Sequence, residues 1–200
     1  MKYIELLENL KDPIFSVQDL RLSGNKVIPS QFSSSVKKGW IIKLKNGLYL
    51  LDSKKDLVIP ENIAFRVYEP SYISLEWALQ VYGLIPEIVY NVTSVTAKTT
   101  RKFKNTFGLF SYKNIRPNLF WGYKKEEKNG QAYLLAEPEK ALLDYVYLNR
   151  SKLGTDDAVR ELRLNREELK TLDWKKLEKY LKVFNNKKTS EIIKKIKCSL

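Results

Sequence analysis

The sequence predicts an α+β protein in which an N-terminal winged helix-turn-helix is followed by a mixed α/β domain with a helical C-terminal region. Short helical segments and an Asn-Gly hairpin turn occupy the first part of the chain, an arrangement typical of winged helices. Segments rich in β-branched and aromatic residues follow, and amphipathic helical segments come last. We therefore expect two domains, residues 1–58 and 59–200, the second ending in a helical, basic region from about residue 151.

The first two helices are predicted from apolar spacing and from capping residues. Apolar residues about one helical turn apart indicate the first helix: Ile4, Leu6, Leu7 and Leu10. Pro13 follows and ends that helix, because proline cannot continue it. Ser16 is the expected N-cap of the second helix, since Asp19 stands three positions later and completes a shortened capping box.

The third helix carries the predicted DNA-binding face, because in a winged helix-turn-helix it enters the major groove. It begins at Pro29, turns Phe32 and Val36 toward the core, and ends at Gly39. Its outward-facing positions are Ser30, Gln31, Ser33, Ser34, Lys37 and Lys38. Small hydroxyl side chains permit a close approach to DNA, Gln31 can pair with adenine through two hydrogen bonds, and lysines reach phosphates.

The hairpin that follows is the predicted wing. Its strands are residues 40–44 and 48–51, and the turn between them contains Asn-Gly, the strongest short-range hairpin signal. The wing residues expected near the DNA backbone or the minor groove are Lys43, Lys45 and Asn46. The alternative interpretation is a winged helix that binds another protein and keeps a serine-rich, solvated face.

The charge balance favours an anionic partner. The chain has 36 Lys and Arg residues against 23 Asp and Glu residues, a net charge of +13. No carboxylate occurs between Asp19 and Asp52, a window whose basic residues are Arg21, Lys26, Lys37, Lys38, Lys43 and Lys45. Since solvated faces usually mix the two signs of charge, this window favours nucleic acid.

A second window without carboxylates lies between Glu87 and Glu126. Its basic residues are Lys98, Arg101, Lys102, Lys104, Lys113, Arg116, Lys124 and Lys125. Residues 99–105 are expected to form an exposed loop between strands. The candidate phosphate contacts are Lys98, Arg101, Lys102 and Lys104. The alternative is a loop that is merely solvated.

Aromatic residues in the same region support another interpretation, a stacking platform for single-stranded nucleic acid. These residues are Phe103, Phe107, Phe110, Tyr112, Phe120, Trp121 and Tyr123. Alternation along the strands places most of them in the core instead.

The middle of the chain alternates helices and strands, which predicts a mixed domain. The expected helices are 60–67, 75–82 with Ser74 as its N-cap, and 137–148. The expected strands are 88–95, 107–112, 119–125 and 131–135, of which the last two form a hairpin around an Asn-Gly turn.

The last fifty or so residues are expected to form capped helices with one basic face. Thr155, Asn165 and Asp173 are the residues expected to cap or precede the helices. The lysines opposite the apolar stripes are Lys175, Lys176, Lys179, Lys182, Lys194 and Lys195. Such a face is either solvated or a flank that contacts phosphates.

Composition excludes several kinds of chemistry. The chain has no histidine and one cysteine, Cys198, which excludes His-dependent catalysis, His-ligated metal sites and an intramolecular disulfide. No P-loop motif and no long apolar segment is present. We expect a cytoplasmic protein that is not an enzyme, holds no metal or cofactor and has no membrane partner. The alternative, a Mg²⁺-dependent nuclease, would need Glu126, Glu127 and Lys128 on a central strand next to Glu87.

Six segments together carry a family resemblance. In chain order they are KNGLY at 45–49, PSYISLEWAL at 70–79, YGLIPE at 82–87, TSVT at 93–96, FGLFSY at 107–112 and EPEKALLD at 137–144. Through these segments the chain resembles the AbiEi family, the antitoxins and transcriptional regulators of AbiE abortive-infection systems, over roughly residues 1 to 150. The remaining residues are similar only in being helical and basic.

The resemblance implies that the winged helix binds the promoter of its own operon and represses it. It also implies that the C-terminal domain counteracts a nucleotidyltransferase-like toxin in a type IV toxin–antitoxin system, generally without a stable complex between the two proteins. We therefore expect a DNA-binding regulator whose partner is double-stranded DNA. The alternative is a non-catalytic adaptor that binds nucleic acid or an acidic protein.

Overall fold

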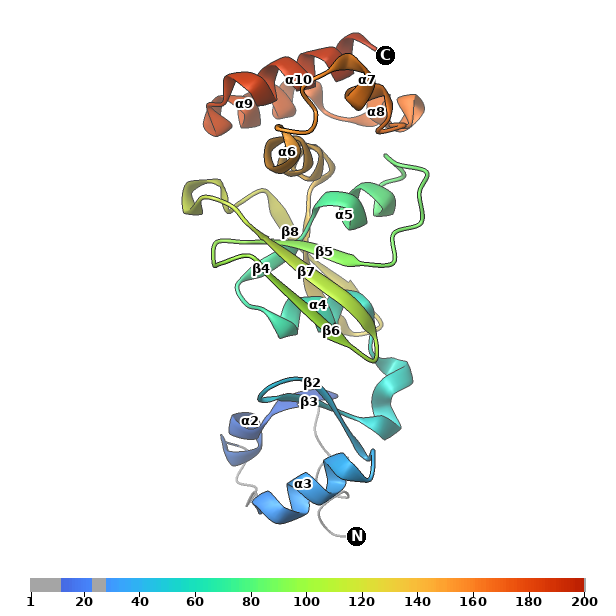
Figure 1. Cartoon of the computed structure of the whole chain (residues 1–200), viewed down its shortest axis with the longest axis vertical. Helices are drawn as coiled ribbons and strands as arrows, with labels where there is room; N and C mark the ends of the chain where they lie inside the picture. The colour runs from blue at the N-terminus through green and yellow to red at the C-terminus, as the bar shows by residue number, and fades with distance from the viewer. Residues whose placement is uncertain (1–11, 23–27, 200) are drawn as a thin grey trace.

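The computed structural model describes residues 12–22 and 28–199. Along its longest axis the molecule has a small sheet with N-terminal helices at one end, a six-stranded sheet in the middle, and a helical layer at the other end (Figure 1). The chain is therefore α+β with a mixed sheet and several helices, as predicted. The first predicted helix, around residues 4–10, lies outside the described residues.

The N-terminal sheet has three strands in the order β1-β3-β2. Its elements are β1 (Ile14–Ser16), α2 (Val17–Leu22), α3 (Pro29–Lys37), β2 (Ile41–Lys45) and β3 (Leu48–Leu51). β1 is not predicted from the sequence, because three residues are too few to show the alternation of a strand. β1 pairs antiparallel with β3, so the hairpin gains a third strand.

Both faces of this small sheet are buried, each against a different core. On one face, α2 and α3 cover a small apolar cluster formed by Phe15, Leu20, Phe32, Ile41 and Leu51. On the other face, the side chains join the main core of the protein: Ile14, Leu44, Leu48 and Leu50. Because successive strand residues point to opposite faces, one short sheet binds the N-terminal helices to the rest of the molecule.

The central sheet has six strands in the order β6-β7-β5-β4-β9-β8. These strands are β4 (Ser71–Ile73), β5 (Val92–Thr96), β6 (Arg101–Asn105), β7 (Gly108–Asn114), β8 (Tyr123–Lys128) and β9 (Gln131–Ala136). β4 runs parallel to β9 and β5 runs parallel to β7, whereas the other neighbours are antiparallel.

Helices connect and cover this sheet. In chain order, η1 (Asp52–Leu57) and α4 (Pro60–Val67) come between β3 and β4. Helix α5 (Leu75–Val81) follows β4, η2 (Pro117–Leu119) follows β7, and α6 (Pro138–Asn149) follows β9. The helical layer consists of α7 (Asp156–Arg160), α8 (Arg166–Thr171), α9 (Trp174–Phe184) and α10 (Lys187–Cys198). In the part of the chain that the structure describes, no helix is long and apolar enough to cross a membrane.

Three strand predictions are corrected by the structure. The strand expected at 88–95 begins only at Val92, and Ile88 and Tyr90 before it are exposed. The loop expected at 99–105 contains an edge strand, β6. The hairpin strand expected from residue 119 begins at Tyr123, because η2 precedes it. Sequence patterns fail at β6 because edge strands tolerate charged side chains on both faces.

Side-chain caps confirm several predicted helix starts. The Ser16 Oγ accepts a hydrogen bond from Asp19 N at 3.0 Å, and Asp19 Oδ2 accepts one from Ser16 N at 2.7 Å. Thr155, Asn165 and Asp173 each accept a hydrogen bond from a backbone N–H in the first turn of the helix that follows. These caps form because both partners lie within four residues of each other.

Ser74 occupies the predicted N-cap position of α5, but its side chain does not cap the helix. Its Oγ donates to Asp144 Oδ2 at 3.0 Å instead. Thr93 on β5 takes over the cap: its Oγ1 accepts from Trp77 N at 3.0 Å and donates to Ser74 O at 2.7 Å. A buried carboxylate competes more strongly for a hydroxyl donor than a backbone N–H that another oxygen can satisfy.

A buried ion pair joins α6 to the centre of the sheet. The side chains of Lys140 and Asp144 are fully buried and contact each other one helical turn apart. Lys140 Nζ donates to Tyr72 Oη at 2.7 Å, and Tyr72 Oη donates to Asp144 Oδ2 at 2.8 Å. Burial lowers the pKa of Lys140 and raises the pKa of Asp144, while the attraction between the two charges opposes both shifts.

The surroundings of Lys140 leave no space for a larger neighbour. Its Nζ lies 5.1, 5.3 and 5.2 Å from the ring centres of Tyr72, Trp121 and Phe184. Gly122 has a φ of +76°, and a Cβ at this position would lie 2.9 Å from Lys140 Cγ. Any other residue at this position would therefore strain the backbone and displace the lysine.

A second, half-buried cluster attaches the helical layer. Lys176 Nζ on α9 lies 3.0 Å from Glu137 Oε2 and 3.1 Å from Glu139 Oε2. Tyr180 Oη donates to Glu137 Oε2 at 2.6 Å. Burial acts to raise the pKa of Glu137, but the hydrogen bonds from Tyr180 and Lys176 outweigh it and the pKa is lowered. For Lys176, burial acts to lower the pKa, but the two glutamates raise it.

We expect Asp144→Asn to reduce the free energy of unfolding by about 3–5 kcal/mol, because it leaves a buried lysine without its counter-charge. The double variant Lys140→Met with Asp144→Asn should lose clearly less free energy of unfolding than the sum of the losses in the two single variants. Urea denaturation of all four proteins measures this coupling. If the loss in the double variant equals the sum of the two single losses, Lys140 and Asp144 do not stabilise the fold as a pair.

We expect Glu137→Gln to lower the melting temperature at neutral pH. Because the folded pKa of Glu137 lies below 4.5 and that of Lys176 above 10.5, their contribution is present between roughly these values. The difference between wild type and variant should therefore shrink as the pH falls through the folded pKa of Glu137. Melting curves from pH 3 to 9 test this, with Glu178→Gln, in an exposed pair with Lys197, as the control.

Candidate nucleic-acid interface

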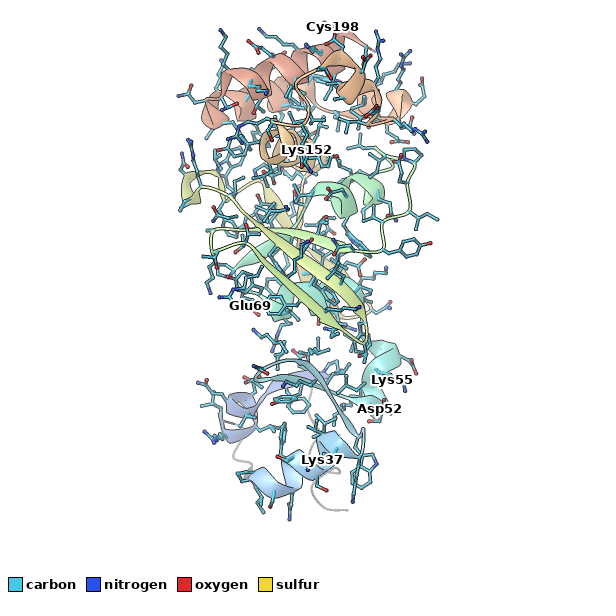
Figure 2. The ribbon with its side chains drawn as sticks, in the orientation of Figure 1. Lys37, Asp52, Lys55, Glu69, Lys152 and Cys198 are labelled. Carbon is cyan, nitrogen blue, oxygen red and sulfur yellow. The ribbon has the colours of Figure 1, made fainter. Side chains whose placement is uncertain are left out.

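The residues of the predicted recognition face, on α3 and directly after it, are all exposed. The six residues are Ser30, Gln31, Ser33, Ser34, Lys37 and Lys38. The opposite side of the helix is held by Phe32, whose ring meets the Tyr49 ring edge-on at 4.7 Å. Ser35, which sequence reasoning did not single out, is buried and donates its hydroxyl hydrogen bond to Gln31 O at 2.9 Å. Packing thus orients the polar face away from the core, at the end of the molecule far from Cys198 (Figure 2).

An exposed aromatic residue stands beside the end of α3, and sequence reasoning missed it. Trp40 is 48% exposed, and Lys38 Nζ lies 4.7 Å from its ring centre. Gly39 between them has a φ of +77°, which turns the chain sharply from α3 into β2. The signal available in the sequence was a tryptophan directly after a helix-ending glycine, where a ring that starts a strand need not be buried.

The hairpin residues are not equally exposed. Lys43 and Asn46 are exposed, but Lys45 is half-buried. Burial lowers the pKa of Lys45, and nearby Lys98 adds to this effect, while Glu69 opposes it. Lys45, one of the three predicted wing residues, thus lies beside β6 of the central sheet.

The hairpin packs against β6. Asn105 Nδ2 donates to Leu44 O at 3.3 Å across this contact. A cavity of about 510 Å³ lies between the two elements. Its lining residues are Lys43, Leu44, Lys45, Asn46, Tyr68, Arg101, Phe103 and Lys104. The two sequence windows without carboxylates thus meet in space, and we call this cavity the cationic cleft.

The candidate phosphate contacts separate into two groups. Arg101 and Lys104 line the cationic cleft, whereas Lys98 and Lys102 do not. Lys98 Nζ donates to Glu69 O at 2.6 Å and lies 5.8 Å from the Tyr68 ring centre. Lys102 is exposed elsewhere on β6. The cleft therefore concentrates positive charge from two distant parts of the sequence at one place.

The aromatic residues of this region do not form an exposed platform. Phe110 and Tyr112 are fully buried, and the others in the set are at least half-buried. Phe103 and Tyr112 meet edge-on at 5.8 Å, and Tyr72 packs on Tyr123 at 4.8 Å. Two of the seven aromatic residues therefore lie in the core, and the other five are half-buried and pack against it.

The acidic residues of the nuclease alternative are not placed as that mechanism requires. Glu126, Glu127 and Lys128 lie on β8, an edge strand, and Glu87 lies between α5 and β5, outside the sheet. Within residues 12–22 and 28–199, no three or more Cys, Asp or Glu side chains are grouped so as to hold a metal ion.

The basic face of the C-terminal helices is partly neutralised. Lys176 contacts Glu137 and Glu139, and Lys195 pairs with Asp156. The other lysines of the predicted face are exposed: Lys175, Lys179, Lys182 and Lys194. Two of the six lysines therefore have structural partners that sequence spacing alone did not indicate.

Comparisons with known proteins add no assignment. No protein-family model matches the chain, and no match is found among curated proteins.

We expect Lys45→Met to raise the melting temperature at neutral pH and low salt. Because the pKa of Lys45 is lowered in the folded state, the unfolded state binds the proton more tightly, and the charged side chain disfavours folding. The gain should shrink as the pH approaches 10.5, where both states lose the proton. Melting curves test this, and Lys43→Met, on the same strand but exposed, should give a smaller gain.

Proposed function

We propose that the protein is a site-specific regulator that binds double-stranded DNA through an N-terminal winged helix-turn-helix. The observation that carries this proposal is the pairing of an exposed Ser/Gln/Lys face on α3 with a cationic cleft beside the β2–β3 hairpin. Helix, hairpin and cleft have the residue types that base edges and phosphates require. In this proposal α3 is the recognition helix and the hairpin is the wing.

Side-chain chemistry assigns different contacts to α3 and to the cationic cleft in this proposal. Gln31 would read an adenine edge, while the serines around it allow the helix to approach closely. Arg101, Lys104 and Lys45 would hold the phosphate backbone, which positions the protein without reading sequence. A bound phosphate would also offset the unfavourable burial of Lys45. Repression follows where the bound site overlaps the promoter of the protein's own operon.

The antitoxin role is a further part of the proposal and rests on the resemblance to the AbiEi family. In it, the C-terminal part counteracts a nucleotidyltransferase-like toxin, without need for a stable complex. Co-expression of the chain with a nucleotidyltransferase-like protein from the same operon tests this role through cell growth. Growth arrest that the chain does not relieve would remove this role and leave the DNA-binding proposal standing.

An adaptor that binds an acidic protein is the second candidate, favoured by the same cationic cleft. Fluorescence anisotropy separates the two candidates, with one labelled duplex from upstream of the gene and one scrambled duplex over a salt series. A regulator should bind its site at about 10⁻⁸ M or tighter and at least about a thousandfold better than the scramble. Equal and steeply salt-dependent binding to both duplexes would contradict the regulator proposal.

We expect two kinds of variant to behave differently in this assay. Gln31→Ala should lose about 1–3 kcal/mol of discrimination at one or two base pairs. Lys45→Ala and Arg101→Ala should weaken binding to both duplexes alike, and each should reduce the salt slope by about one. Lys102→Ala is the matched control, because it removes a charge from β6 outside the cleft. Unchanged discrimination in Gln31→Ala would show that α3 is not the recognition helix.

A further inference from the structure

A second basic cavity lies in the helical layer, at the opposite end of the molecule from α3 (Figure 1). It has a volume of about 650 Å³ and is formed by residues of α7, α8, α10 and the segment between α7 and α8. Small-molecule sites commonly have volumes of several hundred cubic ångströms. The cavity is therefore large enough for a ligand of nucleotide size.

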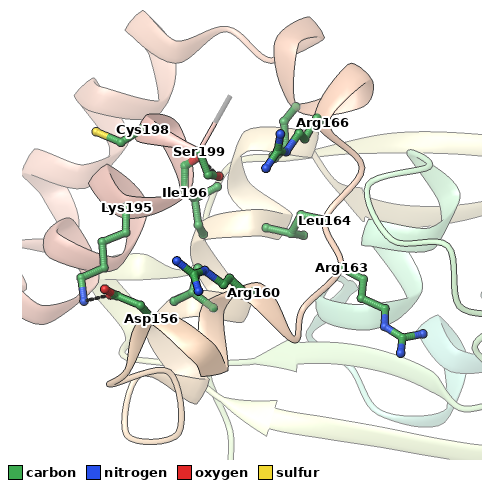
Figure 3. A pocket seen from close by; sticks show the side chains of 11 residues that line it. Asp156, Arg160, Arg163, Leu164, Arg166, Lys195, Ile196, Cys198 and Ser199 are labelled. Atoms are coloured by element: carbon green, nitrogen blue, oxygen red, sulfur yellow. Dashed lines mark hydrogen bonds and ion pairs between the residues drawn. The ribbon is translucent and has the colours of Figure 1, made fainter.

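Arginines dominate the polar part of this cavity. Arg160 and Arg166 lie on either side of Leu164 and Ile196, whereas Arg163 points away from them (Figure 3). Two guanidinium groups on one cavity suit a phosphate, because each can donate two parallel hydrogen bonds to its oxygens.

Few carboxylates pair with these arginines. Arg166 forms no ion pair with any residue among those that the structure describes. Arg160 lies 3.7 Å from Asp157, but both side chains are more than 80% exposed, so that pair is weak. The acidic lining residue Asp156 is already engaged by Lys195. The cavity therefore keeps a net positive charge.

The floor of the cavity is apolar. Leu169 and Ile196 are each 1% exposed, and Val159 and Leu164 beside them are half-buried. Of these residues, Val159 and Leu164 keep apolar surface open to the cavity, and a bare phosphate would not cover it. An organic body such as a base or a sugar ring would cover it while the phosphate meets the arginines.

We propose that this cavity binds a small organic phosphate of the nucleoside monophosphate class. Arg160 and Arg166 hold the phosphate, and the base lies on Val159 and Leu164. The site lies apart from the cationic cleft, so it does not depend on the proposed DNA binding.

Isothermal titration of the full chain with AMP, inorganic phosphate and adenosine tests the proposal. AMP should bind at least tenfold more tightly than inorganic phosphate, because phosphate alone leaves the apolar floor uncovered. Adenosine should show no saturable binding, since the arginines would have no anion to hold. Arg166→Gln should weaken AMP binding at least tenfold, and Arg166→Lys should fall between wild type and Arg166→Gln. Arg116→Gln is the matched control, because it removes an exposed arginine far from the cavity in sequence and outside its lining.

Three results would overturn the proposal. Equal binding of AMP by wild type and Arg166→Gln would show that the cavity is not the site. No saturable binding of AMP at millimolar concentration would show that it takes no ligand of this class. Duplex binding by Arg166→Gln should equal that of wild type, which separates this test from that of the regulator. Loss of duplex affinity in Arg166→Gln without AMP binding would assign the arginines to DNA and overturn the proposal.

Discussion

The buried ion pair between Lys140 and Asp144 is the interaction on which the arrangement of sheet and helices depends. Two charges inside an apolar core are tolerated only when each has partners with good geometry. Tyr72 and Ser74 supply the hydroxyl donors for Asp144, so α6 is held at one register against β4. The rings of Trp121 and Phe184 close over the lysine and bring the segment before β8 and helix α9 to the same place.

The N-terminal sheet imposes a second constraint, because it is shared by two cores. One face holds α2 and α3 and the other belongs to the main core. The exposed face of α3 is thereby fixed relative to the central sheet instead of being carried on a flexible arm. The same packing sets the β2–β3 hairpin against β6, which is why charges from both elements converge in the cationic cleft.

Convergence of like charges opposes folding and favours an anionic ligand. Lys45 illustrates this conflict: its burial lowers its pKa, and a neighbouring lysine adds to the cost. An anion in the cleft would relieve both effects. The cavity in the helical layer likewise has arginines in excess of carboxylates. In the cluster of Glu137, Glu139 and Lys176, by contrast, the lysine pairs with both glutamates. Positive charge in excess of nearby carboxylates favours an anionic ligand, whereas charges that pair with one another stabilise the fold.

Local features of this protein could be predicted from the sequence alone. The Ser16–Asp19 capping box, the Asn-Gly hairpin and the exposed face of α3 depend on residues close together in the chain, so spacing reveals them. Residues far apart decide the rest. The Ser74 hydroxyl donates to the buried carboxylate of Asp144, 70 positions away, instead of capping α5. The charged segment after residue 100 forms a strand because β7 pairs with it. The cationic cleft likewise exists only where packing brings Lys45 to Arg101, which no local pattern encodes.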